Sequence, residues 1–88
     1  MKTFDDLEFK KHHIAGTQAV MEFDNGYGVS VITGPIAYGG DHGLYELAVL
    51  KGASLCYDTP VTDDVIGHLS PAEVSEKMAE VQTLPKAS

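Results

Sequence analysis

The chain has 88 residues, of which 43% are hydrophobic, a composition that fits one small folded domain and argues against intrinsic disorder. Its formal net charge is −7, because six lysines oppose thirteen carboxylates and arginine is absent. Direct nucleic-acid binding depends on cationic contacts to phosphates, so this composition argues against it. A basic protein, or a site that normally receives nucleic acid, would attract such a chain, although the charge also serves solubility alone.

The chain offers no membrane-spanning segment, since none approaches the roughly 20 apolar residues that a bilayer requires. The segment from Met1 to Asp6 lacks the apolar run of a signal peptide, so we expect a cytoplasmic protein. The single Cys56 cannot form an intramolecular disulfide. We therefore expect one domain over residues 1–88, held by packing or self-association, with a frayed tail at about 86–88.

The N-terminal segment predicts a short helical turn followed by extended chain. Thr3 is a suitable cap, and Asp5 and Asp6 would lie near the positive end of the turn. Extended chain is expected through residues 10–13, with a bend at Gly16.

The strongest β signal is a hairpin on either side of Asp24-Asn25-Gly26. A two-residue turn would pair Met21 with Ser30 and put the apolar residues of the two strands on opposite faces. A three-residue loop instead pairs Met21 with Val29 and gathers six apolar residues on one face: Ala19, Met21, Phe23, Tyr27, Val29 and Val31. We predict the three-residue loop, with Gly26 in the left-handed conformation.

A second hairpin is expected after a glycine-rich loop over residues 34–43. Leu44–Leu50 and Ser54–Tyr57 are its strands, and pairing Val49 with Leu55 and Leu47 with Tyr57 keeps apolar residues together. The segment Thr62–Gly67 predicts a single helical turn that glycine ends.

The C-terminal helix is the clearest element of the sequence. Ser70 and Glu73 form a capping box with Pro71 at the first helical position. Apolar side chains then recur on one face, and Pro85 ends the helix; these side chains are Val74, Met78 and Val81. The predicted fold is α+β: an antiparallel sheet of about four strands, in two hairpins, with the helix packed on one face.

No catalytic or metal-binding pattern emerges from the titratable residues, so we expect neither an enzyme nor a cofactor. The candidate metal ligands match no known ligand spacing, and they are His12, His13, Asp41, His42, Asp58, Asp63, Asp64 and His68. Cys56 is expected within a strand, as a structural thiol rather than a nucleophile. The glycines do not form a phosphate-binding loop.

The glycine-rich loop is the candidate binding surface for a protein partner. It carries Tyr38, a residue type common at interfaces, together with Ile36, Asp41 and His42. The alternative is that Tyr38 folds back over the sheet as a lid.

Three stretches of the chain resemble small proteins of unknown function that tailed bacteriophages and prophages encode. They are DNGYG (24–28), YGGDHGLYELAV (38–49) and YDTPVTDDVIG (57–67), and the resemblance extends from about Asp24 to Val81. It implies an accessory protein acting inside a bacterial cell. It transfers no catalytic residue, because these proteins carry no assigned activity.

The leading hypothesis is therefore a non-enzymatic phage-type protein that binds another protein, with a host or defence factor as its target. One alternative is a structural protein that self-associates, as a homodimer through an open sheet edge. A second is a small ligand- or metal-binding protein that uses the loop with Asp41 and His42.

Overall fold

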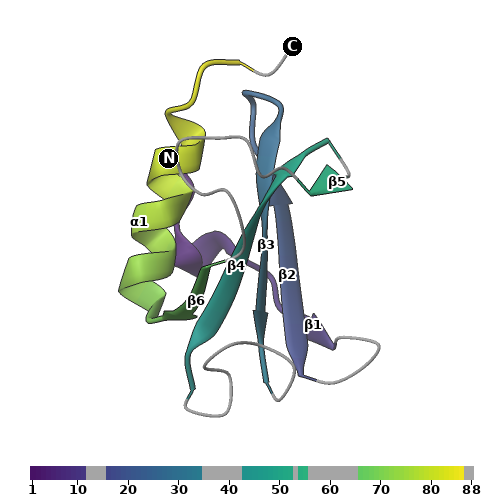
Figure 1. Ribbon diagram of the computed structural model, residues 1–88, viewed down its shortest axis with the longest axis vertical. Helices are drawn as coiled ribbons and strands as arrows, with labels where there is room; N and C mark the ends of the chain where they lie inside the picture. The colour runs from purple at the N-terminus through teal and green to yellow at the C-terminus, as the bar shows by residue number, and fades with distance from the viewer. Residues whose placement is uncertain (12–15, 35–42, 53, 56–65, 87–88) are drawn as a thin grey trace.

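The fold is a twisted antiparallel sheet with one long helix against one face (Figure 1). The computed structural model describes residues 1–11, 16–34, 43–52, 54–55 and 66–86. In chain order the elements are a 3-10 turn η1 (Phe4–Asp6), strands β1 (Lys10–Lys11), β2 (Thr17–Glu22), β3 (Tyr27–Thr33), β4 (Tyr45–Lys51), β5 (Ser54–Leu55) and β6 (Ile66–Leu69), and helix α1 (Pro71–Gln82). The predicted α+β class is confirmed, with the short strands β1 and β6 added to the predicted four.

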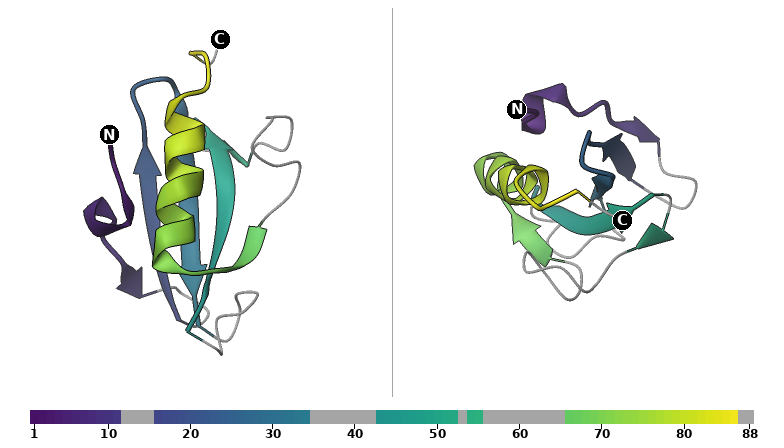
Figure 2. Two further views of the ribbon diagram at one scale, coloured as in Figure 1. Left: turned by 90° about the vertical axis from the view of Figure 1, so that its left-hand side faces the viewer. Right: turned by 90° about the horizontal axis from the view of Figure 1, so that it is seen from above.

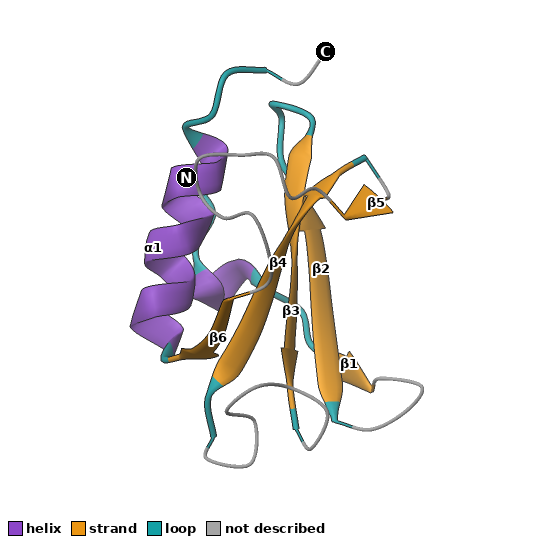
Figure 3. Ribbon diagram, in the orientation of Figure 1, coloured by secondary structure: helices purple, strands orange, loops and turns teal. Residues whose placement is uncertain are grey.

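The strand order explains where the edges of the sheet lie. Neighbouring strands follow the order β1-β2-β3-β4-β5, and β6 also pairs with β4. Figure 3 shows β2, β3 and β4 as the long central strands, with β1, β5 and β6 as short pieces at their sides. Strands β5 and β6 share the outer edge of β4, and β1 covers only part of the outer edge of β2.

The β2–β3 hairpin has the predicted three-residue loop. Met21 pairs with Val29 and Ala19 with Val31. The Phe23 amide donates to the Tyr27 carbonyl at 2.8 Å, which closes the loop. Gly26 has a φ of 85°, the left-handed conformation that this loop needs.

The core forms where α1 covers β3 and β4. Val29, Val31, Leu47 and Val49 are fully buried from the sheet side. From the helix side, the predicted stripe is also fully buried, and it consists of Val74, Met78 and Val81. Figure 2 shows α1 lying along the face of the sheet in its left-hand view. Because the apolar faces predicted for the strands and the helix are the buried ones, the predicted packing of the helix on one face of the sheet is confirmed.

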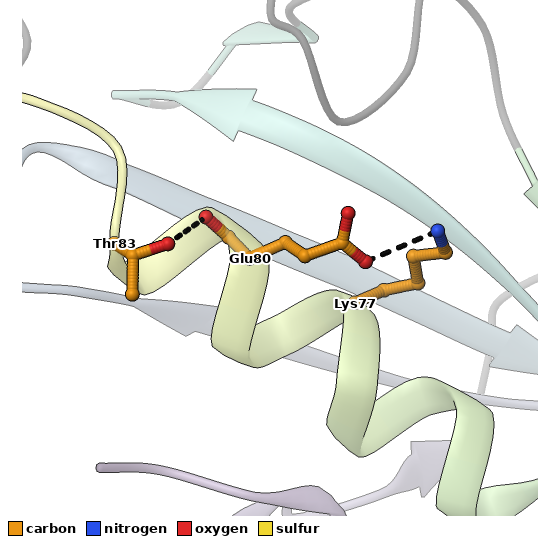
Figure 4. Close-up of polar contacts among 3 residues, drawn as sticks. All are labelled: Lys77, Glu80 and Thr83. Carbon is orange, nitrogen blue, oxygen red and sulfur yellow. Dashed lines mark hydrogen bonds and ion pairs between the residues drawn. The ribbon is translucent and has the colours of Figure 1, made fainter.

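The capping box of α1 is present as predicted. The Glu73 amide donates to the Ser70 hydroxyl at 3.3 Å, and the Ser70 amide donates to the Glu73 carboxylate at 3.0 Å. On the exposed side of the helix, Lys77 Nζ lies 3.1 Å from a Glu80 carboxylate oxygen, and the Thr83 hydroxyl donates to the Glu80 carbonyl (Figure 4). These polar side chains therefore lie away from the core, as the helical period requires.

The register of β5 differs from the prediction. Leu55 pairs with Leu50 and Ser54 with Lys51, in place of the predicted pairing of Val49 with Leu55. The predicted partner of Leu47, Tyr57, lies outside the described residues, and Leu47 pairs with Ile66. The reason is a two-residue connection between Lys51 and Ser54, which Gly52 permits with a φ of 63°.

The helical turn predicted over Thr62–Gly67 is wrong for its last two residues. Ile66 and Gly67 belong to β6, and residues 62–65 lie outside the described residues. The pairing of β6 with β4 shifts register between Tyr45 and Leu47, which is a β-bulge. His68 has a φ of 60° there, while Leu69 is buried in the core. The packing of Leu69 in the core and the pairing of β6 at this bulge therefore outweigh the local signal for a helical turn ending at Gly67.

Candidate protein interface

The residues predicted from sequence to bind a partner, Ile36, Tyr38, Asp41 and His42, lie outside the described residues, and their role stays a prediction. The same holds for all the candidate metal ligands except His68, and for Cys56. Within the described ranges, no group of three or more His, Cys, Asp or Glu side chains could hold a metal ion. His68 is exposed at the β6 bulge.

The outer edge of β2 is the most distinctive surface in the part of the chain that the structure describes. The hydrogen bond from the Phe23 amide to the Tyr27 carbonyl determines which residues of β2 direct their backbone groups toward β3 and which direct them outward. In an antiparallel ladder the residues alternate between bonding inward and facing outward. Val20 and Glu22 therefore direct their backbone N–H and C=O groups away from β3. Strand β1 pairs only with Thr17 and Gln18, so no described strand pairs with Val20 or Glu22.

The N-terminal segment before β1 is hydrogen-bonded to the helix. The Lys2 amide donates to Gln82 Oε1 at 2.8 Å, and Gln82 Nε2 donates to the Lys2 carbonyl at 2.7 Å. The Phe4 amide donates to the Ser75 hydroxyl at 2.9 Å. In the register of β1, the residues that would continue the ladder opposite Val20 and Glu22 are Glu8 and Asp6. The Asp6 amide instead donates to the Thr3 carbonyl at 2.9 Å within η1.

Aromatic packing holds the same segment in place. The ring centroid of Phe4 lies 5.7 Å from that of Phe9 and 5.1 Å from that of Tyr45. The centroids of Phe9 and Tyr45 are 5.5 Å apart. These spacings are typical of favourable aromatic pairs. Phe4 and Phe9 are therefore anchored against the hydrophobic core, and Leu7 packs there with them.

Two hollows follow the open edge. The larger, about 520 Å³, is lined by Met1, Lys2, Glu22, Phe23, Asp24, Asn25, Gln82 and Lys86. The smaller, about 240 Å³, is lined by Glu8, Lys10, Lys11, Gln18 and Val20. Each outward-facing residue of the edge thus lines a hollow, Glu22 the first and Val20 the second.

The exposed large hydrophobic side chains in the described ranges are Met1, 77% exposed, and Val20, 58% exposed. Both line these hollows. The surroundings of Val20 on its face of the sheet are polar, since Gln18 Nε2 donates to the Ser30 hydroxyl at 2.9 Å beside it. Exposed apolar side chains next to unpaired backbone groups are characteristic of a surface that pairs with another chain.

Val20 was not identified from the sequence as part of a site, although it lies next to Met21 in the strand and therefore on the opposite face of the sheet. The available signal was its position between Gln18 and Glu22, because it is the apolar member of an otherwise polar alternation.

The comparisons with known proteins leave this surface as the main guide to function. No protein-family model, curated protein or solved structure matches the chain. In the ranges that the structure describes, no helix has the length and apolar character to cross a membrane.

Proposed function

We propose that this chain is a non-enzymatic, phage-type accessory protein that acts by binding another protein, a host or defence factor, through the outer edge of β2. The observation that carries the proposal is the unpaired stretch of that edge, from Val20 to Glu22, with the exposed Val20 at its start. Open edges normally carry protecting features such as prolines, lysines or bulges. No proline, lysine or bulge occurs between Ala19 and Glu22, and Glu22 is the one charged residue of this stretch.

The charge of the chain favours a basic partner. At −7 it would attract a cationic protein and speed the encounter at low ionic strength. The same charge makes direct binding to nucleic acid unfavourable.

A capture experiment tests the proposal when it compares the wild type with a variant altered at the β2 edge. Immobilised wild-type protein and the Val20→Pro variant are each incubated with bacterial lysate at low salt, and the captured proteins are identified by mass spectrometry. Proline at this position removes an outward-facing N–H and leaves the ladder to β3 intact. We expect a reproducible partner with the wild type that is lost with Val20→Pro.

Two further variants guard against misfolding. Val20→Thr keeps a β-branched side chain at the edge and should retain the partner, whereas Val20→Lys adds an edge lysine and should lose it. Circular dichroism checks that each variant is folded. A capture profile that is the same for the wild type, Val20→Pro and Val20→Lys would exclude the β2 edge as the binding surface.

Self-association through the same edge is the alternative that the structure brings into view. Antiparallel pairing of two β2 edges centred on Met21 would use both open residues of each copy. It would place Val20 of one copy opposite Glu22 of the other, in a dimer with a formal charge twice −7. Both features disfavour the homodimer. Analytical ultracentrifugation measures dimer formation directly. A concentration-dependent dimer that Val20→Pro abolishes would establish self-association through this edge.

A further inference from the structure

We propose that the β2 edge accepts an extended segment of its partner as an added antiparallel strand, with a lysine or arginine opposite Glu22 and a β-branched apolar residue opposite Val20. This inference rests on the proposed function and specifies the partner that would fit the site. The backbone bonds would supply affinity, and the two side-chain positions would supply selectivity.

The orientation follows from the strand that already occupies the edge. Strand β1 runs antiparallel to β2 and pairs Lys10 with Gln18. In an antiparallel ladder the next outward-facing positions are Val20 and then Glu22. An added strand in line with β1 therefore forms two-way hydrogen bonds with these two residues, and β1 limits how far the added strand can continue toward Gln18.

The spacing of the two positions defines a short pattern in the partner. Because the strands are antiparallel, the residue opposite Glu22 precedes the residue opposite Val20 by two. Both of these side chains would lie on the same face of the sheet as Val20 and Glu22. The pattern is a cation, any residue, then valine or isoleucine.

The apolar position is argued from Val20. Its side chain is 58% exposed and lines the smaller hollow with Gln18 and Glu8. Directly opposed β-branched side chains on an antiparallel pair bury each other and stabilise the pairing. A polar residue there would leave Val20 without an apolar contact.

The cationic position is argued from Glu22. Its side chain is exposed, and it forms no ion pair within the described part of the chain. Lys2 and Lys86 line the same hollow as Glu22 and Asp24, so the local charge there is balanced. The preference for a cation therefore rests on direct opposition to Glu22 and on the net charge of the chain.

Short blocked peptides test the pattern, with the ¹⁵N-labelled full chain observed by NMR. The first probe is acetyl-Ser-Thr-Lys-Thr-Val-Ser-amide, in which lysine would lie opposite Glu22 and valine opposite Val20. We expect its addition to shift the amide signals of Val20 and Glu22. Replacing the lysine of the peptide by glutamate should weaken binding about three- to tenfold, because an attractive cross-strand pair with Glu22 becomes a pair of like charges.

Two N-methylated peptides distinguish strand addition from non-specific binding. Methylation of the valine nitrogen removes an N–H that faces β2, so binding should fall by about tenfold or more. Methylation of the nitrogen of the threonine before it removes an N–H that faces away, so the Val20 and Glu22 signals should still shift. On the protein side, Glu22→Lys should reverse the preference, so that the glutamate peptide binds more tightly than the lysine peptide.

Three results would overturn this inference: no shift with any peptide at millimolar concentration, equal binding of both methylated peptides, or shifts of Val20 and Glu22 that follow protein concentration without peptide. The third would identify a second copy as the occupant. If a Val20-dependent partner is captured from lysate while all peptides fail, the protein-binding function stands and the added-strand inference fails.

Discussion

Asn25 connects the β2–β3 loop to the C-terminal end of α1 with both ends of its amide. Its Nδ2 donates to the Val81 carbonyl at 2.8 Å and to the Leu84 carbonyl at 3.2 Å. Its Oδ1 accepts from the Tyr27 amide at 3.1 Å. One side chain thus binds the loop backbone at Tyr27 and two carbonyls at the end of α1, of which the Val81 carbonyl also accepts from the Leu84 amide at 3.2 Å.

We expect Asn25→Asp to destabilise the fold by about 2 kcal/mol, because it retains the acceptor but loses both donated bonds. It also places a carboxylate beside helix carbonyls, whose partial charge is negative. Urea unfolding at pH 7 measures the change in the free energy of unfolding. Asn25→Ala removes the same donors and also the acceptor of the Tyr27 amide, but it adds no charge. We expect it to lose less than Asn25→Asp; a larger loss in Asn25→Ala would show that the bond from Tyr27 outweighs the repulsion of the carboxylate by the helix carbonyls.

At the scale of the element, α1 depends on the capping box at its first turn. The backbone amide and then the hydroxyl of Ser70 hold the pKa of Glu73 below its ordinary value of 4.5, and Lys77 lowers it further. A carboxyl with a lowered pKa in the folded state stabilises the fold above its unfolded pKa, and this contribution is lost as pH falls through the folded value. The charge of Glu73 therefore matters at neutral pH and ceases to matter in acid.

We predict that Glu73→Gln is less stable than the wild type at pH 7 and that the difference disappears as pH is lowered below 4.5 and through the lowered pKa of Glu73. Glutamine keeps the hydrogen-bonding shape of the capping box, so this variant isolates the charge. Ser70→Ala should cost about 1 kcal/mol at pH 7, because it removes the hydroxyl that accepts from the Glu73 amide. It should also reduce the dependence on pH, because the same hydroxyl helps to lower the pKa of Glu73. Urea unfolding curves across this pH range test both, and a difference between the wild type and Glu73→Gln that stays constant with pH would contradict the role of the charge.

The two hairpins differ in how far their registers could be predicted from the sequence. The β2–β3 register was predictable because only a three-residue loop brings six apolar residues to one face. The β5 register was not, because Leu47, Ala48, Val49 and Leu50 are all buried. A strand that is buried on both faces gives no alternation from which to choose between two registers one residue apart.

The open edge could not be predicted either, for a reason that belongs to the N-terminal segment. The spacing of Phe4, Leu7 and Phe9 does not decide between the helical and the strand period, so the local pattern did not determine where they pack. Whether they extend β1 along β2 or lie against α1 depends on tertiary contacts such as Phe4 to Ser75. The only signal for the open edge in the sequence was Val20, the apolar residue between Gln18 and Glu22. The predicted binding site in the glycine-rich loop stays a prediction, because residues 36–42 lie outside the described ranges.

At the scale of the whole molecule, the net charge of −7 opposes the compact state through self-repulsion. Part of this charge lies on the outer side of α1, where Glu73, Glu76 and Glu80 are exposed and Lys77 pairs with Glu80. Salt screens interactions between exposed charges. We therefore expect the free energy of unfolding to rise on going from 20 to about 200 mM NaCl, by on the order of 0.5 kcal/mol.

Glu76→Lys makes this expectation specific to charge. The substitution changes the formal net charge by two, from −7 to −5, and places a cation three residues after Glu73 and four before Glu80. It should stabilise the fold by about 0.5 kcal/mol at low salt, because helix pairs at these spacings are each worth about 0.2–0.5 kcal/mol. Glu76→Gln removes the repulsion without adding attraction and should lie between the two. Since screening weakens both effects, the three proteins should converge in stability at high salt; a gap that persists there would show that helix propensity, rather than charge, separates them.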